Sequence, residues 1–382
     1  MVGEWRRSRI GITVLIAGAA LVLTLLFVDR ISRKMPDLAV YWTAAVRARG
    51  AEPLYRIEDG HYQFKYLPAF AVLAIPLSSA TLESAKAIWF VASVALLAAL
   101  IVLSLRFLPE RRKPAWLLVG VTLLVMLKFY GHELVLGQMN ALFAVIVASA
   151  ILALRRGNEW VAGALIALAI VVKPYAIIFL PWLLFRGRRK SIGAATAGTI
   201  LALAIPALVY GVQGDIELHR HWWETVSSST APNLTNADNV SIAAMWAKWI
   251  GVGGLATTLA AGTSVVLLAL TLLVCFNRSS VSFPDGLEAA LLLTVIPLLS
   301  PQGWDYVFLV STPAIMLLVN YDDLNPQFTR LVIRVALAAI GLSVYDIMGR
   351  AAYGRFMSLS LITLCYFVVV GGLWGLRRRR IA

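Results

Sequence analysis

Residues 161–190 read VAGALIALAIVVKPYAIIFLPWLLFRGRRK. The run from Val161 to Phe185 is apolar except at Lys173-Pro174, and it is long enough for a bilayer, which takes about 20 helical residues. Arg155-Arg156 precede it and a basic cluster, 186–190, follows it. Because short basic connections stay in the cytoplasm, the run must leave the membrane on the side where it entered. We therefore predict two half-crossings, 160–172 and 174–185, with proline breaking the helix between them.

The composition of the whole chain agrees with a membrane protein. Of 382 residues 60% are hydrophobic and only 14% are charged, against about 25% charged in soluble domains. The mean hydropathy is +0.80, and apolar runs of about 20 residues recur throughout. No part resembles a separate soluble domain. We predict one all-α, polytopic integral-membrane domain over residues 1–382.

The net charge of +14 could indicate nucleic-acid binding, but its distribution argues against that class. The basic residues cluster in short connections between apolar runs, which is the pattern that fixes membrane topology. Following that pattern, we predict about twelve crossings with both termini in the cytoplasm of a cell (plasma or inner) membrane. The predicted spans are 10–28, 84–106, 115–131, 136–154, 160–172, 174–185, 191–212, 254–276, 286–299, 305–320, 328–348 and 354–376.

Two long connections fall on the outer side of this topology. The first, 29–83, is expected to begin with an amphipathic helix carrying Asp37 and Tyr41, and its apolar segment 67–80 is too short to span. The second, 211–253, contains histidines, tryptophans and a polar tract. Loops of this length are usually functional or disordered, and their aromatic content favours order.

Five polar motifs lie at the outer ends of spans or in these loops. They are Asp37, Gly137-Gln138-Met139-Asn140, Lys173-Pro174, Asn239-Val240-Ser241 and Ser300-Pro301-Gln302-Gly303-Trp304-Asp305. Polar groups gathered at the mouth of a helix bundle are typical of a ligand site. The sequence therefore predicts one outward-facing polar cavity.

Each candidate residue has a functional and a structural interpretation. Asp37 suits a general base for an acceptor hydroxyl, while Pro36-Asp37 also fits a helix N-cap. Lys173 suits a phosphate partner, or it reaches the outer interface as long cationic side chains do. Gln138 and Asn140 suit sugar hydroxyls, or they form hydrogen bonds between helices.

A metal site and a cofactor are not expected. His219 and His221 form a weak His-x-His signal, and no Asp-x-Asp pair occurs in an outer loop to hold a metal-bound sugar nucleotide. A metal-independent reaction with a lipid-phosphate donor fits these observations better.

The ordered motifs resemble glycosyltransferase family 87, the polyprenol-phosphate-mannose-dependent α-mannosyltransferases of the GT-C superfamily. The matching elements are Asp37 with Tyr41, Gly50 with Pro53-Leu54-Tyr55, Phe64-Lys65-Tyr66-Leu67-Pro68 with Pro76-Leu77, Gly137-Gln138-x-Asn140, Gly163 with Lys173-Pro174, Asn239-x-Ser241 and Ser300-Pro301-x-x-Trp304. The resemblance implies a GT-C fold with an outward active site, a catalytic carboxylate in the first outer loop and a polyprenyl-phosphate sugar donor. It also implies an inverting transfer to a glycan or glycolipid acceptor.

Carried over by position, the resemblance makes Asp37 the base and sets Lys173, with Lys65 and His61, at the donor phosphate. The residues it implies for the sugar or acceptor are Tyr41, Tyr66, Gln138, Asn140, Asn239, Ser241 and Trp304. Family members often have histidine after the tryptophan, whereas this chain has Asp305-Tyr306.

The sequence leaves other functions open. Relatives include arabinofuranosyl transferases, so the resemblance favours mannose without fixing it. A transporter or flippase for a lipid-linked sugar would show paired broken helices in two halves, and only the break at Lys173-Pro174 is clear. A non-catalytic membrane subunit would not require Asp37, Gln138 and Lys173 to converge.

Overall fold

The computed structural model describes residues 22–276, 278 and 281–381. Within these ranges the regular structure is helical, and the one isolated β-bridge joins Asn239 to Trp304. Most of the predicted first span, 10–28, lies outside the described residues; π-helix η1 (Phe27–Ile31) follows it. An all-helical membrane protein is confirmed.

Four helices of the described chain are long and apolar enough to cross a membrane. They are α4 (Leu82–Phe107), α5 (Ala115–Leu136), α12 (Gly254–Phe276) and α17 (Leu361–Arg378). The number rises to six if each of two bent pairs is one span. Shorter apolar helices cover other predicted crossings, so the figure of about twelve stays a prediction.

The two bent pairs differ from what the hydropathy pattern suggests. Predicted span 191–212 corresponds to α9 (Arg189–Ala204) and α10 (Ala207–Ser228), which meet at 90°. Predicted span 328–348 corresponds to α15 (Gln327–Leu342) and α16 (Tyr345–Ser358), which meet at 107°. Pro206 lies at the first bend, where a proline ring opposes continuation of the preceding helix.

The predicted break at Lys173-Pro174 is confirmed. Helix α7 (Glu159–Val172) stops there because Lys173 is extended, with φ −146° and ψ 113°. A 3₁₀ turn, η4 (Pro174–Ile178), then leads into α8 (Phe179–Phe185). Proline has no amide hydrogen to give the preceding turn, so the chain can leave the helix at this point.

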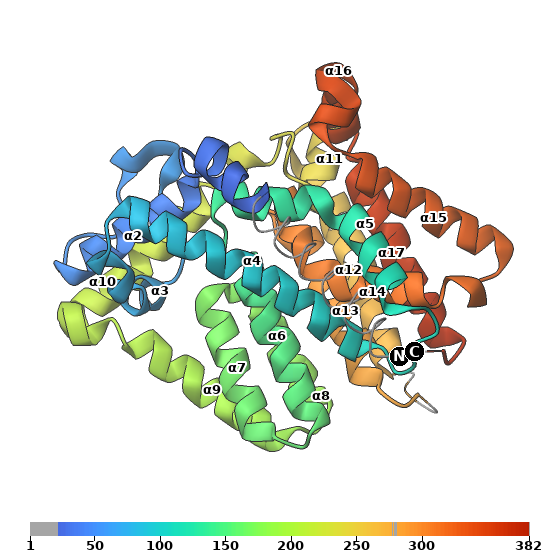
Figure 1. The fold of residues 1–382 in the computed structure, drawn as a ribbon. Helices are drawn as coiled ribbons and strands as arrows, with labels where there is room; N and C mark the ends of the chain where they lie inside the picture. Colours follow the sequence, from blue (N-terminus) through green and yellow to red (C-terminus); the bar gives the residue numbers. More distant parts are fainter. Residues whose placement is uncertain (1–21, 277, 279–280, 382) are drawn as a thin grey trace, which may run out of the picture.

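The centre of the molecule is formed by α13 (Pro284–Leu299) and by α14 (Thr312–Asn320), which follows η6 (Asp305–Ser311). Every residue of α13 from Asp285 to Leu298 is buried, and so is every residue of α14. Figure 1 shows these helices between α17 and the group of α4 and α6 (Asn140–Arg155). A helix that is apolar on all sides belongs in such a core.

The segments predicted to be outer loops are largely helical. The first contains α2 (Pro36–Arg49), η2 (Ile57–Tyr62), α3 (Pro68–Leu73) and η3 (Ile75–Ser79). The second contains most of α10, then η5 (Ala231–Asn233) and α11 (Ile242–Ile250). Figure 1 shows α2, α3 and α10 together at one end of the molecule, where α3 contacts both of the others. A further 3₁₀ turn, η7 (Asp322–Leu324), connects α14 to α15.

A buried ion network lies near the N-terminal end of α13, around Glu288. Glu288, which is fully buried, accepts hydrogen bonds from Arg186, Arg278 and Arg377, each at 2.9 Å. The indole nitrogen of Trp182 also donates to it at 2.9 Å. These partners come from three separate stretches of chain, so one carboxylate connects α8, the segment just after α12 and α17 to the core helix.

Candidate active site

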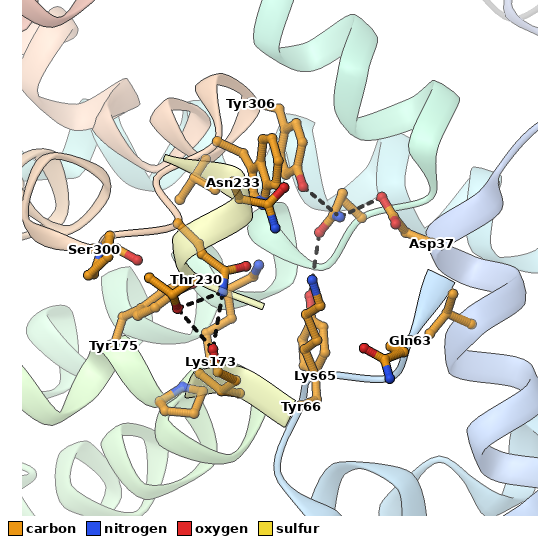
Figure 2. A pocket seen from close by; sticks show the side chains of 18 of the residues that line it. Asp37, Gln63, Lys65, Tyr66, Lys173, Tyr175, Thr230, Asn233, Ser300 and Tyr306 are labelled. Atoms are coloured by element: carbon orange, nitrogen blue, oxygen red, sulfur yellow. Dashed lines mark hydrogen bonds between the residues drawn. The ribbon is translucent and has the colours of Figure 1, made fainter. Parts of the chain in front are cut away.

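A cavity of about 340 Å³ opens where α2, α10 and the break after α7 meet. Figure 2 shows Asp37 on one side of it and Ser300, Tyr175 and Thr230 on the other. Most of the residues predicted from the sequence line this cavity: Asp37, Tyr41, His61, Lys65, Tyr66, Gln138, Lys173 and Trp304. They come from positions far apart in the chain, and they represent four of the five motifs; no residue of Asn239-Val240-Ser241 lines the cavity.

Asp37 is the second residue of α2, and the N-cap position belongs to Met35, which has a left-handed backbone with φ 57°. No side chain caps this helix, so the N-cap interpretation of Asp37 is wrong. Its carboxylate Oδ2 instead accepts a hydrogen bond of 2.6 Å from Nε2 of Gln138. The carboxylate is therefore directed into the cavity by a contact across the fold.

Gln138 is held in one orientation by its own partners. Gly137 ends α5 with a φ of 70°, a conformation that glycine adopts without strain. The Oε1 of Gln138 accepts hydrogen bonds from the hydroxyls of Tyr41, at 3.2 Å, and Tyr66, at 3.4 Å. Because the oxygen faces two hydroxyl donors, the amide nitrogen is the atom that meets Asp37.

The charges around the cavity are mostly positive. Among the described residues that line it, Asp37 is the one carboxylate, and His61, Lys65 and Lys173 are the basic groups. Burial raises the pKa of Asp37 above its ordinary value, and the Gln138 hydrogen bond and the nearby cations oppose that rise. Burial also lowers the pKa of Lys65. The site thus combines a carboxylate of increased basicity with cations that suit an anionic ligand.

Two tyrosines connect the carboxylate side of the cavity to Lys173. The hydroxyls of Tyr41 and Tyr66 lie 2.7 Å apart, and Nζ of Lys173 lies 5.3 Å from the centre of the Tyr66 ring. Burial raises the pKa of both tyrosines well above the usual value. They are therefore neutral at pH 7 and act through hydrogen bonds and ring faces.

Three residues that the resemblance implied for the site do not line the cavity. Asn140 is buried and donates to Oε2 of Glu133 at 2.8 Å. Asn239 donates to the carbonyl oxygens of Asn233 and Pro301, and the hydroxyl of Ser241 accepts from the first turn of α11. These three side chains support the loops that line the cavity, and they do not face it.

Asp305 also lies away from the cavity. It is buried, its carboxylate is 2.6 Å from Nζ of Lys128 and 3.6 Å from Nδ1 of His132, and its neighbour Tyr306 lines the cavity instead. The residue at which this chain departs from the common histidine thus belongs to an ion pair behind the site.

Several cavity residues were not predicted as site residues: Tyr175, Thr230, Asn233, Ser300, Gln302 and Tyr306. Gln302 donates to the hydroxyls of Ser229, at 3.1 Å, and Thr230, at 3.0 Å, and so joins two loops. Ser300, Gln302 and Tyr175 lie in or next to predicted motifs, which is a usable signal. Thr230 and Asn233 lie in a polar tract, and the spacing of its residues gave no signal that these two face a site.

Within the described part of the chain, no group of three or more His, Cys, Asp or Glu side chains is arranged to hold a metal ion.

A family model for glycosyltransferase family 87 matches residues 64–301. No curated protein and no solved structure matches the chain. The matched range includes Lys65, Tyr66, Gln138 and Lys173 of the cavity, and Asp37 lies before it.

Proposed function

Since the chain belongs to glycosyltransferase family 87 and is a membrane glycosyltransferase, we propose that it transfers a hexose from a polyprenyl-phosphate donor. Mannose is the favoured sugar. The proposed acceptor is a glycan or glycolipid at the outer face of the cell membrane. One observation carries the proposal: among the described residues that line the cavity, one partly buried carboxylate faces side chains that are otherwise neutral or basic.

In this proposal Asp37 is the general base. The acceptor hydroxyl attacks the anomeric carbon while an Asp37 oxygen takes its proton, and the bond from that carbon to the phosphate oxygen breaks. The configuration inverts because one displacement occurs. Gln138 occupies Oδ2, so we assign Oδ1 to the acceptor. A carboxylate whose pKa is raised is the better base, because basicity closer to the working pH favours proton transfer.

The lipid phosphate that leaves needs positive charge in the part of the cavity away from Asp37. Lys173 supplies it from the broken helix and Lys65 from the first outer segment, where His61 also faces the cavity as a further candidate for the donor phosphate. Cations fixed in a largely buried site stabilise charge that develops in the transition state. No metal-binding group of carboxylates or histidines enters this scheme.

The orientation of the site is part of the proposal. Helix α7 is 14 residues long, or about 21 Å. Glu159 at its start pairs with Arg188, and Lys173 after its end lines the cavity. The arginine-rich end is expected in the cytoplasm, which supports a cavity that opens outward.

The test is a transfer assay in membranes with labelled polyprenyl-phosphate mannose. Asp37→Asn keeps the shape of the side chain and removes the base, so we expect the rate to fall by about 10²–10⁴, the usual contribution of a general base. Glu58→Gln, at an exposed position of the same outer segment, is the matched control and should transfer normally. A folded Asp37→Asn protein with the wild-type rate would refute the base assignment.

A further inference from the structure

Helix α10 has three distinct faces after Gly211. One face is packed into the protein through Leu218 and Thr225, which are buried. On the same side, Trp222 and Val226 line the cavity, and the indole of Trp222 donates to the carbonyl of Lys65 at 3.1 Å. This face makes α10 a wall of the candidate active site.

A second face is apolar and exposed. Val212 is 74% exposed, Ile216 59% and Trp223 64%. Their spacings of four and seven residues place the three side chains in one stripe along a helix. A stripe of large apolar side chains turned away from the protein needs a partner in a folded protein.

The third face is polar and lies between the other two. It carries Gln213, Glu217, Arg220 and Glu224, which form two hydrogen-bonded pairs at i and i+4. Such a face belongs in water. A helix with one face packed, one apolar and one aqueous fits the boundary between a membrane and water.

The position of α10 supports the same partner. Exposed apolar side chains are also found on α9, at Ile200 and Leu201, and at Leu208 of α10, just before the kink at Gly211. Helix α10 turns by 90° from α9, so an α9 that crosses the bilayer leaves α10 lying in the plane of the membrane. Figure 1 shows this turn beside α2 and α3.

We propose that α10 is an interfacial helix that inserts Val212, Ile216 and Trp223 into the lipid surface at the cavity end of the molecule. Apolar faces of such helices enter the headgroup and acyl boundary by about 5–10 Å. The neighbouring packed face of the same helix holds Trp222 and Val226 in the cavity, so α10 lies between the bilayer and the active site. The inference goes beyond sugar transfer and does not depend on the assignment of Asp37.

Spin labels test this contact directly. The full chain, with Cys275→Ala and Cys365→Ala, would receive single cysteines and be placed in vesicles of phosphatidylethanolamine and phosphatidylglycerol. Labels at Val212→Cys, Ile216→Cys and Trp223→Cys should collide with oxygen, which enters lipid, and be protected from a water-soluble nickel chelate. Labels at Gln213→Cys, Glu217→Cys and Arg220→Cys on the same helix are the matched controls and should show the reverse.

Each other outcome overturns the proposal. If the stripe labels are as open to the nickel chelate as the controls, the stripe lies in water. If both reagents are excluded from the stripe, protein covers it, either a second copy or another chain. Thermal unfolding of each labelled variant establishes that it is folded, so a negative result is not ascribed to misfolding.

Discussion

At the scale of single residues, Gln138 orients the Asp37 carboxylate and favours its charged form. Its amide nitrogen donates to the carboxylate at 2.6 Å, and this bond opposes the rise in the pKa of Asp37 that burial causes. The hydroxyls of Tyr41 and Tyr66 donate to Oε1 of Gln138 and keep the amide in place. In the proposed mechanism Gln138 is therefore a positioning residue, which acts on the reaction through Asp37.

The first prediction concerns the pH dependence of transfer. Asp37 must be ionised to act as a base, so the rate is lost as pH falls through its raised pKa. Gln138→Leu removes a hydrogen bond that favours the charged carboxylate, so the pKa rises further. We expect the acid limb of the kcat/KM profile to move to higher pH.

The control is another amide of the same cavity. Gln63 donates to the carbonyl of Arg56 and not to Asp37, so Gln63→Leu should leave the acid limb where it is in the wild type. Equal shifts in the two variants would show that Gln138 has no specific effect on Asp37.

At the scale of elements, the segment from Ser300 to Val307 depends on a close backbone approach. It runs from the end of α13 into the first residues of η6, forms the bridge between Asn239 and Trp304, and lines much of the cavity. A Cβ atom at Gly303 would lie 2.0 Å from the carbonyl oxygen of Pro297. Only glycine fits there, because backbone atoms cannot move aside as a flexible side chain can.

The second prediction is that Gly303→Ala displaces this segment. We expect a loss of about 1–3 kcal/mol in stability, as for other overpacked sites, together with reduced sugar transfer. Thermal unfolding in detergent and the membrane transfer assay measure the two effects. Gly120→Ala is the control, since nothing lies within 4 Å of a Cβ there, and it should stabilise α5 slightly. Wild-type stability in Gly303→Ala would contradict the close approach.

At the scale of the whole molecule, two charged clusters mark the two ends of the core helix α13. Ser300, just after its end, lines the cavity, and Glu288 near its start holds three arginines. Arg377 belongs to the C-terminal basic run and is almost fully buried. Arg377, which the sequence pattern explains as a cytoplasmic topology signal, therefore also stabilises the fold through its ion pair with Glu288.

The third prediction is that Glu288→Gln weakens the whole fold. Removing one partner of a buried ion pair leaves uncompensated charge and costs about 3–5 kcal/mol. Asp323→Asn, which breaks the more exposed pair with Arg112, should cost about 1 kcal/mol or less. Thermal unfolding of the two variants in the same detergent decides the comparison, and similar losses in both would disprove the structural role of the network.

Much of the protein was predictable from local sequence. The apolar runs indicate membrane helices because about 20 apolar residues suffice, whatever surrounds them. The break after α7 was predictable because Pro174 disrupts a helix in any context. The motifs also indicated one cavity, since polar residues at span ends on one side have few other places to meet.

Only the tertiary structure decided how the residues of the site are used. Gln138 and Asp37 are 101 positions apart, and no local pattern shows which side chain accepts the amide. The same holds for Asn239, whose side chain donates to the carbonyl oxygen of Pro301 in a neighbouring loop, and for Asp305, which pairs with Lys128 behind the cavity. The sequence by itself determined the membrane class, the broken helix and the residues that gather. Packing between distant segments decided which of them face the cavity and where α10 and α16 turn. A contact of this kind depends on two segments at once, so the sequence of either segment alone does not show it.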